Sequence, residues 1–136
     1  MRHEVTIISD DFRFEIGNKV TLAGVYDEAI VFTNLPSRLL KLAFYQRWLD
    51  VVDMRTVRIE VRGSAIGDLS LYAEAKPTTE TPRHQPHNAR ITIALGPLDF
   101  LNVGTLEFLT FFNDDPSPRH IHQLDIRVDP TLKLLT

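Results

Sequence analysis

The strongest pattern along the chain is the alternation of apolar and polar residues, which has the period of a β-strand with one buried face. In segment 57–62, Val57, Ile59 and Val61 alternate with three charged residues. This alternation predicts an antiparallel strand with one face toward the core and one toward solvent. By the same reasoning, further strands are expected at 3–9, 12–16, 20–33, 68–75, 89–95, 98–102, 104–114 and 122–130.

Residues 12–23 are expected to form a β-hairpin, because alternating apolar residues stand on both sides of a Gly-Asn turn. A loop of two residues would place Phe14 opposite Thr21 and mix apolar with polar neighbours. A loop of three residues, 17–19, places Phe14 opposite Leu22 instead. We therefore predict an odd-numbered loop, with Phe14 and Leu22 on the same buried face.

Segment 38–50 fits two periods, since its apolar residues match a helix capped by Ser37 as well as a strand. The aromatic residues Phe44, Tyr45 and Trp48 suit a pleated surface, and the neighbouring segments are all extended. These features favour the strand, with a helix over 38–49 as the alternative.

The predicted strands are short and are separated by turn residues at intervals of about 8–12 residues. This spacing indicates an all-β fold, an antiparallel two-sheet β-sandwich of about seven to nine strands with at most one short helix, at 38–49. The proline-rich stretch 76–88 is expected to be a long exposed loop. With 136 residues the chain fits a single domain, 1–136.

Composition narrows the function classes. The chain has no cysteine, which excludes a disulfide framework, a thiolate zinc site and a cysteine nucleophile. Its net charge of −3, with the signs interspersed, provides no basic face for nucleic acid. Acidic residues stand where a signal peptide would need its apolar core, and no apolar run is long enough to span a membrane. A cytoplasmic location is therefore expected.

The run GNKVTLAGVYDEAIVFTNLP, preceded by ISDDFRF, resembles the opening of a group of small bacterial proteins of unknown function. In that group a Gly-x-Lys turn is followed by Leu-x-Gly-Val-Tyr/Phe and later by a proline. The resemblance covers about residues 5–62. It implies a β-sandwich of about this size and brings no catalytic residues with it.

Four histidines are candidate metal ligands. If residues 120–122 are extended, His120 and His122 point the same way, as two ligands of a metal site on a β-strand would. His84 and His87 add two imidazoles in the proline-rich stretch. The two pairs lie in separate parts of the chain, so loop histidines at the surface are the preferred interpretation.

Aspartates near the predicted strand ends are candidate calcium ligands, as in C2-type modules. These residues are Asp10, Asp11, Asp50, Asp53, Asp114 and Asp115. Aspartate is also an ordinary turn residue, because its side chain accepts hydrogen bonds from nearby backbone, and the spacing here matches no calcium-binding loop. Turn formation is the preferred interpretation.

Segment 104–114 is apolar on both faces, so Leu109 and Phe111 on its second face need a cover. Without a cover from the same chain, they would form a self-association surface. The candidate interaction surface comprises Trp48, Leu109, Phe111, Leu132 and Leu134.

The sequence contains no nucleophile elbow and no phosphate-binding glycine loop, so no catalytic residue, cofactor-binding residue, metal ligand or cofactor is predicted. The preferred hypothesis is a non-enzymatic protein-interaction or assembly module that forms a homo-oligomer or binds another protein. A C2-like calcium- or lipid-binding domain and a cupin-like metal-dependent enzyme are the alternatives.

Overall fold

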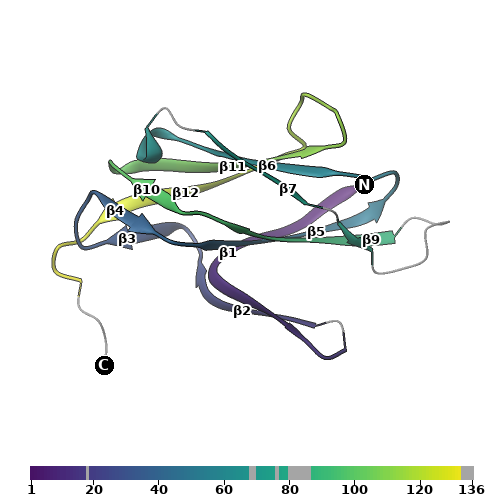
Figure 1. The fold of residues 1–136 in the computed structure, drawn as a ribbon, viewed down its shortest axis with the longest axis horizontal. Coiled ribbons are helices and arrows are strands. Elements are labelled where there is room, and N and C mark those ends of the chain that lie inside the picture. The colour runs from purple at the N-terminus through teal and green to yellow at the C-terminus, as the bar shows by residue number, and fades with distance from the viewer. Residues whose placement is uncertain (18, 68–69, 76, 80–86, 133–136) are drawn as a thin grey trace.

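The computed structural model describes residues 1–17, 19–67, 70–75, 77–79 and 87–132. Two five-stranded sheets lie face to face (Figure 1). Sheet A consists, in spatial order, of β2 (Lys19–Tyr26), β1 (Arg2–Glu15), β5 (Leu42–Val51), β9 (His87–Leu95) and β8 (Thr78–Thr79). Sheet B consists of β3 (Ala29–Phe32), β12 (His120–Val128), β11 (Gly104–Phe112), β6 (Val57–Arg62) and β7 (Leu71–Ala75). A small separate sheet pairs β4 (Ser37–Leu39) with β10 (Leu98–Phe100), and a single 3-10 turn, η1, spans Ser64–Ile66.

The predicted all-β sandwich is confirmed. The described residues form twelve strands, more than expected, because very short strands such as β4, β8 and β10 carry too few residues for a visible alternation. Neighbouring strands are antiparallel except for β3 and β12, which pair in parallel.

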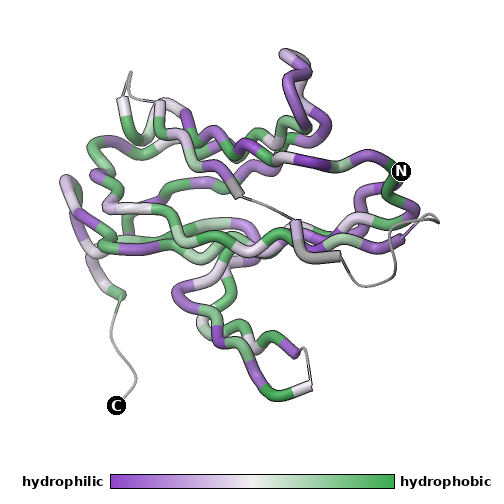
Figure 2. The backbone as a smooth tube through the Cα atoms, turned by 45° about the vertical axis from the view of Figure 1, so that its right-hand side comes forward, coloured by the Kyte–Doolittle hydropathy of each residue, from purple (hydrophilic) through white to green (hydrophobic). Residues whose placement is uncertain are grey.

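One hydrophobic core lies between the two sheets, and strands of both sheets contribute to it. The prediction for 57–62 is confirmed, since Val57, Ile59 and Val61 are buried while the side chains between them reach outward. Figure 2 shows the resulting mixture of hydrophobic and hydrophilic positions along the strands. The largest fully buried side chains are Phe44, Phe100, Phe108, Ile8, Leu42, Ile59, Ile91, Leu98, Leu106, Leu109, Leu124 and Ile126.

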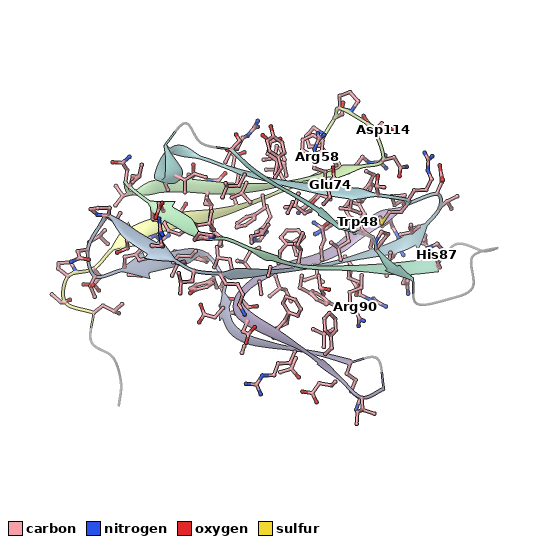
Figure 3. The ribbon with its side chains drawn as sticks, viewed as in Figure 1. Trp48, Arg58, Glu74, His87, Arg90 and Asp114 are labelled. Atoms are coloured by element: carbon pink, nitrogen blue, oxygen red, sulfur yellow. The ribbon has the colours of Figure 1, made fainter. Side chains whose placement is uncertain are left out.

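Segment 38–50 is a strand and not a helix, as favoured. It forms β4 and then β5, which lies at the centre of sheet A between β1 and β9. A central position demands an extended backbone that pairs on both sides, and this requirement overrides the helical spacing. Trp48 on β5 points between the two layers, where its ring packs edge-on against Phe112 at 4.7 Å between centroids (Figure 3).

Three other expectations need correction. The predicted break after residue 9 is wrong, because Ser9 pairs with both Ala43 of β5 and Val25 of β2 and so carries β1 from one partner to the other. Val128, which the alternation in 122–130 places on the inward face with Leu124 and Ile126, is 38% exposed at the end of β12. The predicted loop 76–88 contains β8 and the first residues of β9, and its residues 76 and 80–86 lie outside the described part. The apolar tail is described only as far as Leu132.

The second half of β1 and all of β2 form a hairpin, whose residues 10–26 leave the body below sheet A (Figures 1 and 2). We call these residues the arm. Its three-residue connection, 16–18, confirms the odd-numbered loop. The register differs from the prediction by two residues, since Phe14 faces Val20 and Phe12 faces Leu22.

Phe14 and Leu22 share a face, as predicted, but that face is not buried. Phe14 is 65% exposed, because the arm extends beyond the area that sheet B covers. The expectation of a buried hairpin face is therefore wrong.

Candidate functional site

A chain of hydrogen bonds crosses the core between the two sheets. The fully buried Gln46 of β5 accepts, at Oε1, the indole N–H of Trp48 at 2.7 Å and the hydroxyl of Thr110 at 3.2 Å. Its Nε2 donates to Thr6 Oγ1 at 2.9 Å. Because Thr110 belongs to β11 of sheet B, Gln46 ties the two sheets together with polar contacts inside an apolar core.

This chain continues to a group of three imidazoles. His3 Nε2 lies 2.7 Å from Thr6 Oγ1, and the His3 ring stacks on His120 with 3.6 Å between centroids and 13° between planes. His122, two residues further along β12, points to the same side as His120 and lies 6.3 Å from Phe108, centroid to centroid. We call His3, His120 and His122 the histidine cluster.

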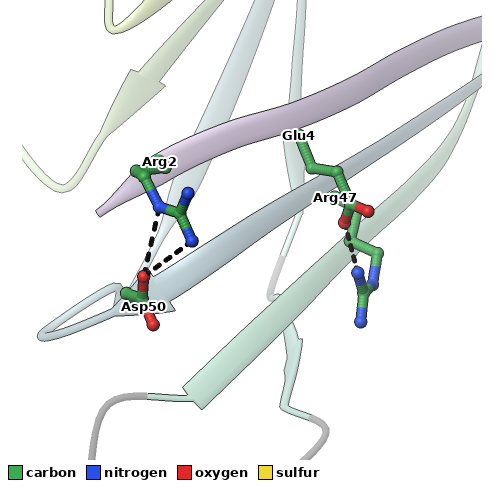
Figure 4. Close-up of polar contacts among 4 residues, drawn as sticks. All are labelled: Arg2, Glu4, Arg47 and Asp50. Carbon is green, nitrogen blue, oxygen red and sulfur yellow. Dashed lines mark hydrogen bonds and ion pairs between the residues drawn. The ribbon is translucent and has the colours of Figure 1, made fainter.

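The cluster lies at an open side of the sandwich. Residues 2–7 of β1 pair only with β5, and residues 120–124 of β12 pair only with β11. The first half of β1 is held on sheet A by two ion pairs to β5, Arg2–Asp50 at 3.2 Å and Glu4–Arg47 (Figure 4). The ladder and these pairs set His3 in place opposite β12.

The histidine cluster favours the neutral imidazole. Burial lowers the pKa of each of the three rings below 6.5, and the repulsion between neighbouring imidazolium charges lowers each pKa further. His122 Nε2 is buried and has no hydrogen-bond partner. Burial and the close stacking of the rings therefore both disfavour protonation of these imidazoles.

Neutral imidazoles are the form that binds transition metals, which makes the cluster the strongest candidate for such a site. Because the His3 and His120 rings are stacked nearly parallel, their nitrogen atoms do not point toward one common position where a metal ion could bind. Within the described ranges, no three histidine, aspartate or glutamate side chains are placed to hold a metal ion. His87 lies in β9, in register with Val51, and His84 is outside the described residues.

The interpretation of His120 and His122 as surface-loop histidines is wrong, because both are half-buried in β12, where they point to the same side. The third member, His3, was missed by the sequence analysis. It lies in a different sheet and 117 positions from His120 along the chain, and no spacing rule connects the two.

The candidate calcium ligands do not gather in one place. Five of the six make separate contacts: Asp11 pairs with Lys41 at 2.6 Å, Asp50 with Arg2, and Asp53 with Arg55 at 3.2 Å. Asp10 accepts the Tyr26 hydroxyl, and Asp115 Oδ1 accepts the backbone N–H of Ser117 at 2.9 Å. Asp50 and Asp53 also adopt positive φ, as turn residues do. Asp114 lies in the loop beyond sheet B (Figure 3).

The predicted interaction surface needs correction. Trp48, Leu109 and Phe111 are buried by their own chain, with exposures of 3%, 1% and 5%, so none of them is available to a partner. Phe111 is covered by Arg58, whose guanidinium carbon lies 4.4 Å from the ring centre. Leu132 is 45% exposed, and Leu134 lies outside the described residues.

Among the described residues, two of the three most exposed large apolar side chains lie on the arm, where Phe12, Val20 and Leu22 are half-buried. Phe12, Phe14, Val20 and Leu22 share one face, and Ile16 at the tip is 98% exposed. Among the strands of the described part, β2 pairs with β1 alone.

The base of the arm is fixed to the body by the ion pair of Asp11 with Lys41, and its two strands are joined there by the Tyr26 hydroxyl, which donates to Asp10. Gly24, with φ of 70°, leaves the space that the Asp10 side chain occupies, because a Cβ there would meet the carboxylate. The arm is therefore a projecting apolar ribbon on an anchored base.

Comparison of the chain with protein-family models, with curated proteins and with solved structures gave no match. The described residues include no helix that is long and apolar enough to cross a membrane.

Proposed function

We propose that this chain is a non-enzymatic interaction module that binds a partner protein through the apolar face of the arm. The observation that carries this proposal is the exposure of two large apolar side chains, Phe14 at 65% and Ile16 at 98%, on a hairpin that projects from a well-packed body. Clustered apolar groups at the surface are typical of protein-binding sites.

The energy available at the arm supports binding. Complete burial of a Phe or Ile side chain is worth roughly 1.5–3 kcal/mol, so the two exposed residues alone offer about 3–6 kcal/mol before the cost of association. A two-stranded ribbon gains little stability from its own contacts. Covering the apolar face would therefore stabilise the arm as well as the complex.

The body supplies a rigid support for the arm. The two sheets share one core, and Gln46 links them with hydrogen bonds to both layers. We place this activity in the cytoplasm, a reducing compartment that suits a chain without cysteine.

The test compares the partner proteins that the wild-type chain retains with those that arm variants retain. The double variant Phe14→Ser/Ile16→Asp should lose the bound partner while its unfolding temperature stays within the range of other surface variants. Tyr72→Ser is the matched control, because Tyr72 is 64% exposed on β7 of the other sheet. Retention of the same partner by the arm variant, or loss of it by the control alone, would disprove the proposal.

A further inference from the structure

The outer strand of the arm is an unprotected sheet edge. The outermost strands of the two five-stranded sheets are β2, β8, β3 and β7, with 8, 2, 4 and 5 residues. Over the described residues β2 is the longest of the four, contains no proline and keeps one register with β1, and its ladder is interrupted at Gly24, whose φ is 70°. Proteins usually shorten, bulge or charge such an edge, because its free N–H and C=O groups can pair with another strand.

We infer that β2 pairs edge to edge with β2 of a second copy of this chain. This inference rests on the proposed function and names the partner. Antiparallel pairing of two identical strands has two-fold symmetry, which is the commonest symmetry of homo-oligomers. The two copies of sheet A then form one continuous sheet through their arms.

The alternation of side chains restricts the register of this pairing. Directly opposed residues in an antiparallel pair lie on the same face, so the apolar positions Val20 and Leu22 must face even-numbered residues of the second copy. Only registers with a residue on the two-fold axis satisfy this condition. A register displaced by one residue would set the apolar face of one arm beside the polar face of the other.

The charges of the arm select one register and favour a second copy as the partner. The outer part of the arm carries Arg13 and Lys19 with one acid, Glu15. Its base carries Asp10 and Asp11, of which Asp11 is paired with Lys41, and the acids Asp27 and Glu28 follow directly after β2. Antiparallel pairing brings the tip of each arm to the base of the other. With Ala23 on the axis, Val20 faces Tyr26, the last residue of β2, and Lys19 lies beside Asp27, which follows the strand; axes at Leu22 or Gly24 set Lys19 opposite an uncharged residue.

Cysteine crosslinking tests the register directly, because the chain contains no other cysteine. Ala23→Cys places two thiols opposite each other across the axis, with Cα atoms about 4.5–5.5 Å apart, within the range of a disulfide. Thr21→Cys is the matched control, since the two copies of residue 21 are about 13 Å apart in this register. Both positions are exposed on β2. Mild oxidation should yield a covalent dimer of Ala23→Cys but not of Thr21→Cys, and the reverse result would overturn the register.

Charge exchange tests the contact between the copies. Lys19→Asp should raise the dimer dissociation constant roughly tenfold, because both symmetric pairs become repulsive. The double variant Lys19→Asp/Asp27→Lys should restore wild-type dimerisation, measured by sedimentation velocity at low salt. A loss that the second substitution leaves unrestored would overturn the Lys19–Asp27 contact.

A wild-type chain that stays monomeric across the concentration range and gives no Ala23→Cys crosslink would overturn the inference. That result would leave the proposed function intact if Phe14→Ser/Ile16→Asp still lost a different partner protein. Failure of the proposed function would appear separately, as an arm variant that keeps every partner of the wild type.

Discussion

Replacing Gln46 by leucine should be among the most destabilising single changes in the core. Leucine has a similar volume but accepts and donates no hydrogen bond. The indole N–H of Trp48, on a residue only 3% exposed, and the fully buried hydroxyl of Thr110 would both lose their acceptor. Each unsatisfied buried polar group costs about 1–3 kcal/mol, so the expected loss is about 2–6 kcal/mol. The lost hydrogen bond to Thr6 should add little to this destabilisation, because Thr6 is only half-buried.

Thr110→Val tests the reasoning in a double-mutant cycle. Alone, it removes one of the two bonds that Gln46 Oε1 accepts and should cost about 0.5–1.5 kcal/mol. Added to Gln46→Leu, it removes a hydroxyl that has already lost its acceptor. The double variant should therefore be at least as stable as Gln46→Leu alone, and more stable by about 1–3 kcal/mol at most.

Urea unfolding at pH 8, with the single and double variants beside the wild type, measures these differences. A domain of this size is stable by about 5–15 kcal/mol, so Gln46→Leu removes a large share and still leaves a measurable transition. Additive losses in the double variant would show that Thr110 and Gln46 are not coupled. A loss below about 1 kcal/mol for Gln46→Leu would refute the buried network itself.

Three further changes test other parts of the structure. The folded-state pKa values of the histidine cluster lie below the unfolded value, so the unfolded chain binds more protons and stability should fall as the pH drops below about 6.5. The urea midpoint should fall less steeply between pH 8 and pH 5 for His120→Gln than for the wild type. If both proteins lose stability equally with pH, the histidine cluster is not the cause of that loss. Gly63→Ala should lower the free energy of unfolding by about 1–3 kcal/mol or more, because the new Cβ would clash with a backbone carbonyl of β11. Gly17→Ala is the control, because Gly17 also has a positive φ but lies in open space, and it should lower stability less. Equal melting temperatures of the two variants would contradict this. Arg58→Ala should lower the free energy of unfolding by about 0.5–2 kcal/mol because it uncovers Phe111, while Arg58→Lys should keep part of the contact. If urea unfolding shows no change in stability for Arg58→Ala, another group covers Phe111.

The sequence alone determined the all-β class, most of the strands and the parity of the hairpin loop. All three depend on the period of two, which is a local property of an extended backbone. Val57 to Val61 alternate in the chain because they alternate between core and solvent. A loop of the wrong parity would have turned Phe14 and Leu22 to opposite faces, and the local pattern of residues was sufficient to reject it.

Only the tertiary structure decided which apolar faces are covered. A shift of two residues preserves every face, so local alternation could not distinguish the observed register of Phe14 from the predicted one. Burial depends on whether the other sheet extends far enough: it covers Trp48 and stops short of the arm, whose apolar face is left outside. The histidine cluster depends in the same way on packing, because His3 and His120 meet only when strands from opposite ends of the chain come together across the sandwich.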